Sequence, residues 1–143
     1  MAESKVWLVT GSSTGFGRSM TELLLKNGNR VVATLRRTEV LSGLAEQYPS
    51  SQLLIIQMDV VKSSEVAAAF VKAKEVFGRV DVVFNNAGIA IIGEMESMRD
   101  DEARKTFEVN FWGASNVTRA SGRSGRRTNQ SGEGCCRFLL LWV

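Results

Sequence analysis

The sequence has no histidine, one proline, one tyrosine and two cysteines among its 143 residues. The lack of histidine excludes a histidine-based catalytic triad and the common His-containing zinc sites, so no metal site is expected. The cysteines, Cys135 and Cys136, are adjacent, and such neighbours rarely pair because the disulfide geometry is strained. No apolar run approaches the roughly 20 residues that span a bilayer. Residues 1–5 also lack a signal-peptide pattern, and we therefore expect a cytoplasmic protein without a membrane segment.

The chain has little net charge, and that charge is concentrated at one end. Its formal net charge of +3 resides in residues 121–143, which carry four arginines and one glutamate, whereas residues 1–120 are balanced. A basic pI that comes from a short terminal segment gives little reason to expect nucleic-acid binding. We therefore expect no nucleic-acid partner.

Strand-like and helix-like segments alternate along residues 4–120, a pattern that predicts an α/β domain with a parallel sheet covered by helices. Four apolar segments read as buried strands: 6–9, 30–35, 53–56 and 80–84. Helices are expected after the first glycines, with Phe16, Met20, Leu23 and Leu24 at helical spacing and Gly28 as C-cap, and at 41–47, with Pro49 as the stop.

Two further helices complete the expected domain. One is expected to be capped by Ser63 or Ser64, with Val66, Ala69, Phe70, Ala73 and Phe77 on its buried face. A long helix is expected at about 100–120, with a buried stripe of Ala103, Phe107, Ala114 and Val117. The composition changes at Ser121, so we predict a domain at 1–120 and an irregular tail at 121–143. The apolar run 138–143 could add a fifth strand beside the fourth.

The segment Thr10–Gly17 has the pattern T-G-x-x-x-G-x-G and connects the first strand to the first helix. This context predicts a dinucleotide-binding loop rather than a chance cluster of glycines. Gly11 would allow the sharp turn, Gly15 would let a pyrophosphate approach the backbone, and Gly17 would let helix and strand pack closely. The helix N-terminus would supply free N–H groups to the phosphates. A plain strand–turn–helix connection is the alternative.

The end of the second strand predicts which dinucleotide is bound. An acidic residue about 20 positions past the loop would hydrogen-bond to the ribose 2′-hydroxyl of NAD. This chain instead has Leu35-Arg36-Arg37, and its next carboxylate is Glu39. The planar donors of arginine suit a 2′-phosphate, so the sequence favours NADP(H) over NAD(H). The alternative is that Arg36 is a solvated surface residue.

Together, these motifs resemble those of the short-chain dehydrogenase/reductase family. The matching segments are Thr10–Gly17, Asp59-Val60, Asn85-Asn86-Ala87-Gly88 and the Val109–Gly113 segment of the long helix, and they cover about residues 4–120. The resemblance implies a doubly wound Rossmann-type parallel sheet, here partial, with about four strands in the order 3-2-1-4. It also implies hydride transfer between a nicotinamide and a carbonyl or alcohol substrate.

The resemblance assigns roles to individual residues. Asp59 would accept a hydrogen bond from the adenine amino group, and Asn110 would hold a proton-relay water as the candidate catalytic residue. For Asp59 the alternative is a capping or loop carboxylate, and for Asn110 it is a structural tie between helix and sheet. The candidate cofactor-binding residues are Gly11, Ser13, Thr14, Gly15, Phe16, Gly17, Leu35, Arg36, Asp59, Val60, Asn86, Ala87 and Gly88.

The sequence departs from the family after Asn110. Members use a serine and a Y-x-x-x-K pair, in which the lysine lowers the tyrosine pKa for proton transfer. Here the only tyrosine is Tyr48 and the last lysine is Lys105, so neither role is filled downstream of Asn110. We expect a truncated or altered family member without turnover as this chain. A non-catalytic NADP(H)-binding or interaction protein is the alternative, and the oligomeric state stays open.

Overall fold

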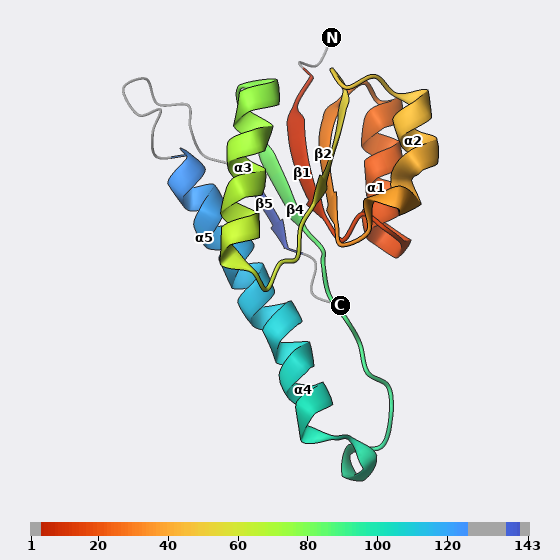
Figure 1. The fold of residues 1–143 in the computed structure, drawn as a ribbon, viewed down its shortest axis with the longest axis vertical. Coiled ribbons are helices and arrows are strands. Elements are labelled where there is room, and N and C mark those ends of the chain that lie inside the picture. Colours follow the sequence, from red (N-terminus) through yellow and green to blue (C-terminus); the bar gives the residue numbers. More distant parts are fainter. Residues whose placement is uncertain (1–3, 126–136, 141–143) are drawn as a thin grey trace.

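The computed structural model describes residues 4–125 and 137–140, which form one parallel sheet with helices on both faces (Figure 1). The strands lie in the order β3-β2-β1-β4-β5. Their bounds are β1 Val6–Thr10, β2 Arg30–Leu35, β3 Leu53–Gln57, β4 Val82–Asn85 and β5 Arg137–Leu140. Every adjacent pair is parallel. The predicted Rossmann-type α/β fold with the order 3-2-1-4 is therefore confirmed.

The helices lie in two layers, with α1 and α2 on one face of the sheet and α3 and α5 on the other (Figure 1). Their bounds are α1 Gly15–Lys26, α2 Ser42–Gln47, α3 Ser63–Phe77, α4 Asp100–Phe107 and α5 Ala114–Gly125. Short 3₁₀ turns occupy Thr38–Leu41 and Met95–Ser97. The predicted long helix is present as α4, a π-helical turn at Glu108–Gly113, and α5.

Alternate residues of each strand feed two separate cores. On one face Leu8, Val32 and Val83 pack with Phe70 of α3 and Val117 of α5. On the other face the cluster includes the following residues of the sheet and of the segments that cover it: Val9, Ala33, Phe84, Leu24, Leu25, Leu41 and Leu44. Burial of each valine, leucine or phenylalanine among them contributes about 1.5–3 kcal/mol relative to leaving it in water. The two cores fix the strands, and hence the loops at the carboxyl ends of the strands.

The helix ends agree only partly with the sequence prediction. Gly28 follows α1 in the left-handed conformation (φ +76°), as a C-terminal glycine should, although Asn27 is the cap residue itself. The predicted serine cap of α3 is wrong, because the helix already begins at Ser63 and its N-cap is Lys62, which makes no side-chain capping bond. The reason is local: the Lys62 N–H donates to the Asp59 carbonyl (3.0 Å), and this turn starts the helix earlier.

The predicted burial of Phe107 is also wrong. Its side chain is 69% exposed, whereas Val117 on the same predicted stripe is fully buried. α4 extends beyond the carboxyl edge of the sheet, so the sheet supports α5 but does not reach beneath α4 (Figure 1). Ala103 and Ala114 are only half-buried, and the π-helical turn at Glu108–Gly113 interrupts the regular helical period between Phe107 and Ala114. The sequence pattern shows neither this turn nor where the neighbouring sheet ends.

The final segment adds the fifth strand to the sheet. β5 pairs with β4 in parallel register, for example Val83 with Phe138 and Phe84 with Leu139. Before it, α5 continues to Gly125, past the predicted helix end at about residue 120. The expectation of a fifth strand beside the fourth is therefore confirmed for residues 137–140, while Cys135 and Cys136 lie outside the described residues. The division into a domain at 1–120 and a tail at 121–143 stays a prediction. Within the described residues, no helix combines the length and apolarity that a membrane span requires.

Candidate functional site

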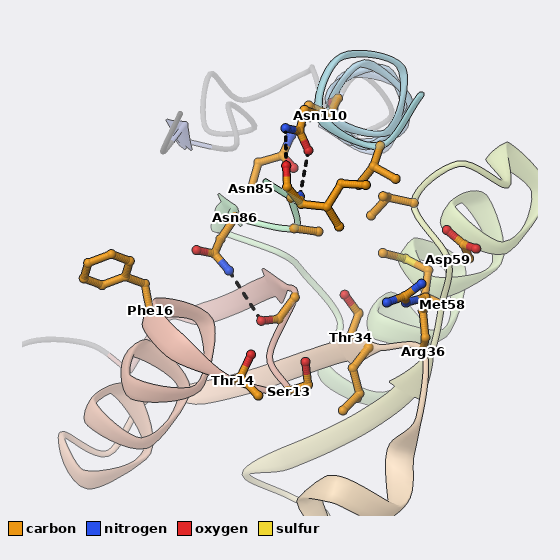
Figure 2. Close-up of a pocket in the computed structure, with 18 of the residues that line it drawn as sticks. Ser13, Thr14, Phe16, Thr34, Arg36, Met58, Asp59, Asn85, Asn86 and Asn110 are labelled. Carbon is orange, nitrogen blue, oxygen red and sulfur yellow. Dashed lines mark hydrogen bonds between the residues drawn. The ribbon is translucent and has the colours of Figure 1, made fainter. Parts of the chain in front are cut away.

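A cavity of about 460 Å³ opens at the carboxyl ends of β1, β2 and β4, under the π-helical turn that follows α4 (Figure 2). The sheet order changes direction between β1 and β4, and ligands of open α/β sheets bind at such a switch point. The candidate residues that line the cavity are Gly11, Ser13, Thr14, Phe16, Leu35, Arg36, Asp59, Val60, Asn86, Ala87, Gly88 and Asn110. Motifs that are far apart in the sequence are thus brought to one place.

Two candidates do not line the cavity, and several lining residues were missed from the sequence. Gly15 and Gly17 lie outside the wall. The missed residues are Thr34, Met58, Asn85, Ile89, Ala90, Lys105, Val109 and Ala114. Thr34, Met58 and Asn85 each immediately precede a predicted site residue, so extending every strand end by one position would have found them. Lys105 has no sequence signal, because its place depends on how far α4 projects past the sheet.

The glycine loop has the conformation that its sequence requires. Gly11 and Gly15 have φ values of +68° and +55°, a left-handed region that is costly for other residues. A Cβ on Gly11 would lie 2.9 Å from the Ala87 Cα, whereas a Cβ on Gly15 would meet nothing within 4 Å. Gly11 therefore allows two backbones to approach each other, and Gly15 leaves open space above the loop.

Gly17 fixes the distance between α1 and the loop. A Cβ at this position would lie 2.1 Å from the Gly11 carbonyl oxygen and 2.6 Å from the Asn86 Nδ2. Because both are closer than any real contact, only glycine fits here. The sequence predicted close packing of helix and strand at Gly17; the close contacts here are to the loop after β1 and the segment after β4.

The N-terminus of α1 is suited to an anion. Its N-cap, Thr14, makes no side-chain capping bond, and the first turn holds no acidic residue. The first turns of α3 and α4, in contrast, contain the carboxylates Glu65 and Asp100 to Glu102. The unpaired N–H groups and positive dipole of α1 therefore remain available beside the open space at Gly15. A dinucleotide pyrophosphate fits these features.

Thr10, at the end of β1, ties the glycine loop to the segment after β4. Its fully buried hydroxyl oxygen accepts hydrogen bonds from the N–H groups of Asn86 and Ala87, both at 2.9 Å. The Asn86 side chain also donates, to the Thr10 carbonyl at 3.1 Å. Three hydrogen bonds to Thr10 therefore join the end of β1 to the segment after β4 at the switch point.

Asn110 lies in the π-helical turn and binds the backbone of the segment after β4. The Ile89 N–H donates to the Asn110 Oδ1, and the Asn110 Nδ2 donates to the Ile89 carbonyl, both at 2.8 Å. π-Helical turns often mark functional positions in helices. The side-chain amide is thus engaged in a structural tie, the alternative that the sequence left open, while the residue also lines the cavity.

Arg36 lies just past β2, on the same side of the cavity as Met58 and Asp59 in Figure 2. Its side chain is exposed and makes no hydrogen bond or ion pair with any residue in the described ranges. The neighbouring Arg37 is also exposed but does not line the cavity. An unpaired guanidinium at a cavity wall is a ready partner for a phosphate.

Asp59 uses one carboxylate oxygen locally and leaves the other free. The Val61 N–H donates to the Asp59 Oδ1 at 3.2 Å, forming a side-chain turn. The second oxygen, Oδ2, has no hydrogen bond to the part of the chain that the structure describes. The loop role that the sequence offered as an alternative is therefore real, and it leaves an acceptor for a ligand amino group.

The sheet order, the glycine loop at the switch point and the cavity above it define a dinucleotide-binding α/β protein of the Rossmann type. The family model described as short chain dehydrogenase matches residues 5–131. The chain belongs to the short-chain dehydrogenase/reductase family.

Individual relatives agree with this assignment. "Oxidoreductase BOA17" of Botryotinia fuckeliana is 36% identical over 117 residues, which are 82% of this chain and 43% of the relative. The 3-ketoacyl-(acyl-carrier-protein) reductase of Brucella melitensis, solved with NADH, superposes with a TM-score of 0.85 at 30% identity, covering 95% of this chain and 56% of that one. The alcohol dehydrogenase of Thermococcus sibiricus, solved with 5-hydroxy-NADP, gives a TM-score of 0.79 at 30% identity, covering 88% and 55%. The chain thus spans less than half the length of the curated relative and just over half of each solved chain.

Proposed function

We propose that this chain is the cofactor-binding part of an NADP(H)-dependent oxidoreductase that acts on a carbonyl or alcohol substrate. Family membership supports a nicotinamide cofactor, since the two solved relatives are complexes with NADH and with 5-hydroxy-NADP. The glycine loop and the α1 N-terminus would hold the pyrophosphate, and Asp59 would accept the adenine amino group. The bound nicotinamide would supply or take up the hydride.

The preference for NADP(H) rests on Arg36. This side chain lines the cavity, is exposed and has no partner among the described residues. A guanidinium there would bind a 2′-phosphate through two donors, and no carboxylate stands at the end of β2 to repel that phosphate. NAD(H), which lacks the phosphate, would leave this cation unpaired.

Calorimetric titration of Arg36→Asp with NADPH and NADH tests the preference. We expect the variant to bind NADPH at least tenfold more weakly, because a charge-assisted bond of about 1.5–3 kcal/mol is lost. We also expect the ratio of the two dissociation constants to move toward NADH, because the new carboxylate can accept from the ribose hydroxyls.

Arg37→Asp is the matched control, since it makes the same charge change one residue away and outside the cavity wall. We expect Arg37→Asp to change the free energy of NADPH binding by at most about 1 kcal/mol, as is typical of an exposed charge. It should leave the ratio of the NADPH and NADH dissociation constants unchanged. Equal effects of the two substitutions on this ratio would contradict the role of Arg36.

A second candidate function is cofactor binding without turnover by residues 1–143. It is favoured by one observation: residues 111–143 contain neither tyrosine nor lysine, so no residue there matches the family's proton donor and its partner. Asn110 is the candidate catalytic residue only under the first proposal, the oxidoreductase. We expect no measurable NADPH oxidation by the purified chain with simple ketones and aldehydes. Saturable turnover would contradict this candidate.

The remaining parts of the proposal concern partners and location. We propose a small carbonyl or alcohol compound as the substrate of the complete reaction, no nucleic-acid or membrane partner, and a cytoplasmic location. These rest on family membership and on the charge balance of residues 1–120.

A further inference from the structure

The cavity wall at Asp59 and Val60 is held in place by side chains outside the cavity. These two residues belong to the turn between β3 and α3. Within the turn, the Lys62 N–H donates to the Asp59 carbonyl at 3.0 Å. The turn therefore carries the candidate adenine acceptor, and its position depends on what holds it from outside.

Glu65, in the first turn of α3, binds this turn directly. The Asp59 N–H donates to its Oε2 at 2.8 Å, and the Lys62 Nζ donates to its Oε1 at 2.8 Å. Glu65 itself does not line the cavity. It is therefore one hydrogen bond removed from the candidate ligand position.

This contact differs from ordinary helix capping. In α4 the third residue, Glu102, accepts from the N–H of its own N-cap, Arg99. Glu65 occupies the same third position in α3, but the N–H of its N-cap, Lys62, is already used by Asp59. Glu65 reaches back past its N-cap to the cavity wall instead.

α5 supports the same turn from a second side. The Asn116 Nδ2 donates to the Val60 carbonyl at 3.0 Å and lies 3.4 Å from that of Val61. At the end of the π-helical turn, a Cβ on Gly113 would lie 2.6 Å from the Val60 Cγ2, so helix and loop are in close contact. Asn116 therefore holds the Val60 end of the turn, while Glu65 supplies the side-chain contact to the Asp59 backbone N–H.

We propose that Glu65 is a positioning residue for the adenine half of the cofactor: its Oε2, by binding the Asp59 N–H, fixes the Asp59 carboxylate at the cavity wall. This inference rests on the proposed function. The length of the Glu65 side chain is what matters, because the carboxylate oxygen must lie 2.8 Å from the Asp59 nitrogen to accept its hydrogen bond. The charge of Glu65 is secondary.

Two substitutions separate reach from charge. Glu65→Asp keeps the negative charge at the α3 N-terminus but is one methylene too short to reach Asp59. Glu65→Gln keeps the length and a carbonyl acceptor but removes the charge. Glu75→Asp is the matched control, because Glu75 forms a similar i,i+3 pair with Lys72 (3.2 Å) on the same helix without contacting the turn.

Calorimetry with two half-cofactor probes, adenosine 2′,5′-bisphosphate and nicotinamide mononucleotide, provides the test on the full chain. We expect Glu65→Asp to weaken the adenosine probe about tenfold, on the scale of one lost hydrogen bond, and to leave the nicotinamide probe unchanged. Glu65→Gln and Glu75→Asp should bind the adenosine probe as the wild type does.

The opposite pattern would overturn the inference. Weak binding by Glu65→Gln with normal binding by Glu65→Asp would assign the effect to charge. An equal loss of affinity for both probes in Glu65→Asp would assign the effect to general destabilisation. Unchanged affinity for the adenosine probe in Glu65→Asp would show that Glu65 does not position this half of the cofactor. A wild-type chain that binds neither probe would overturn the proposed function itself, an outcome that differs from all the others.

Discussion

At the scale of single residues, the site depends on closely packed atoms of the glycine loop and the segment after β4, which leave no space for a larger side chain at Gly17. Thr10, Gly11, Gly17 and Asn86 form one cluster in which a hydroxyl, two carbonyls and an amide meet where α1 crosses the loop. Such packed polar clusters tolerate substitution poorly, because a lost partner leaves a buried group unsatisfied. The two glycines are required as strictly as the polar side chains, because a Cβ at either position would lie too close to neighbouring atoms.

Gly17→Ala tests this packing. The new methyl group would lie far inside contact distance of the Gly11 carbonyl, so α1 must move. We expect a loss of stability of about 1–3 kcal/mol or more, the usual cost of overpacking, measured by urea unfolding monitored by circular dichroism.

Gly43→Ala is the matched control for Gly17→Ala. Gly43 is also helical, in α2, and a Cβ there meets nothing within 4 Å. This change should stabilise the chain by up to about 1 kcal/mol through helix propensity. Equal stability of the two variants would show that α1 and the loop are not in close contact.

Glu65 also makes the stability depend on pH. The hydrogen bond from Lys62, followed by that from the Asp59 N–H, holds the pKa of the Glu65 carboxyl below its ordinary value of 4.5. Folding therefore favours the deprotonated form, and its contribution is complete above about pH 4.5 and lost as the pH falls through the lowered pKa. The stability difference between wild type and Glu65→Gln should stay constant from pH 6 to about pH 4.5 and shrink below it. A difference that stays constant to pH 3 would contradict the shift.

At the scale of elements, β5 protects the edge of β4. Its described residues, Arg137–Leu140, pair with β4 in parallel, so β4 has a neighbour on each side within the described chain. An unpaired β4 would instead offer its backbone groups to another molecule.

Two proline substitutions test this pairing. Successive N–H groups of a strand point to opposite sides, so only one of Phe138 and Leu139 can donate toward β4. We expect one of Phe138→Pro and Leu139→Pro to lose about 1–3 kcal/mol and to associate in sedimentation, while the other resembles the wild type and serves as its control. Wild-type behaviour of both variants would contradict the β4–β5 pairing.

The elements also show what the sequence can predict. The strands, the glycine turn and the order of the motifs follow from local pattern, because buried strands need apolar runs and left-handed turns need glycine. The exposure of Phe107 and the place of Lys105 in the cavity wall do not, because both depend on how far α4 projects past the sheet. The tie between Asn110 and Ile89 joins residues whose pairing no local pattern indicates.

At the scale of the whole molecule, two layers of helices hold a sheet whose switch point brings separated motifs to one cavity. Part of the glycine loop, Arg36, the Asp59–Val60 turn and the Asn86–Gly88 segment line it. We propose that these four segments form one NADP(H) site within residues 1–143. The hydrogen bonds to Thr10 join two of these segments directly.

The most direct test is an NMR titration of the ¹⁵N-labelled chain with NADPH, followed by the same titration with NADH. We expect saturable shifts of the backbone amides in Gly11–Gly17, at Arg36, in Asp59–Val60 and in Asn86–Gly88, with tighter binding for NADPH. No saturable shifts, or shifts centred on the outer faces of α3 and α5, would contradict it.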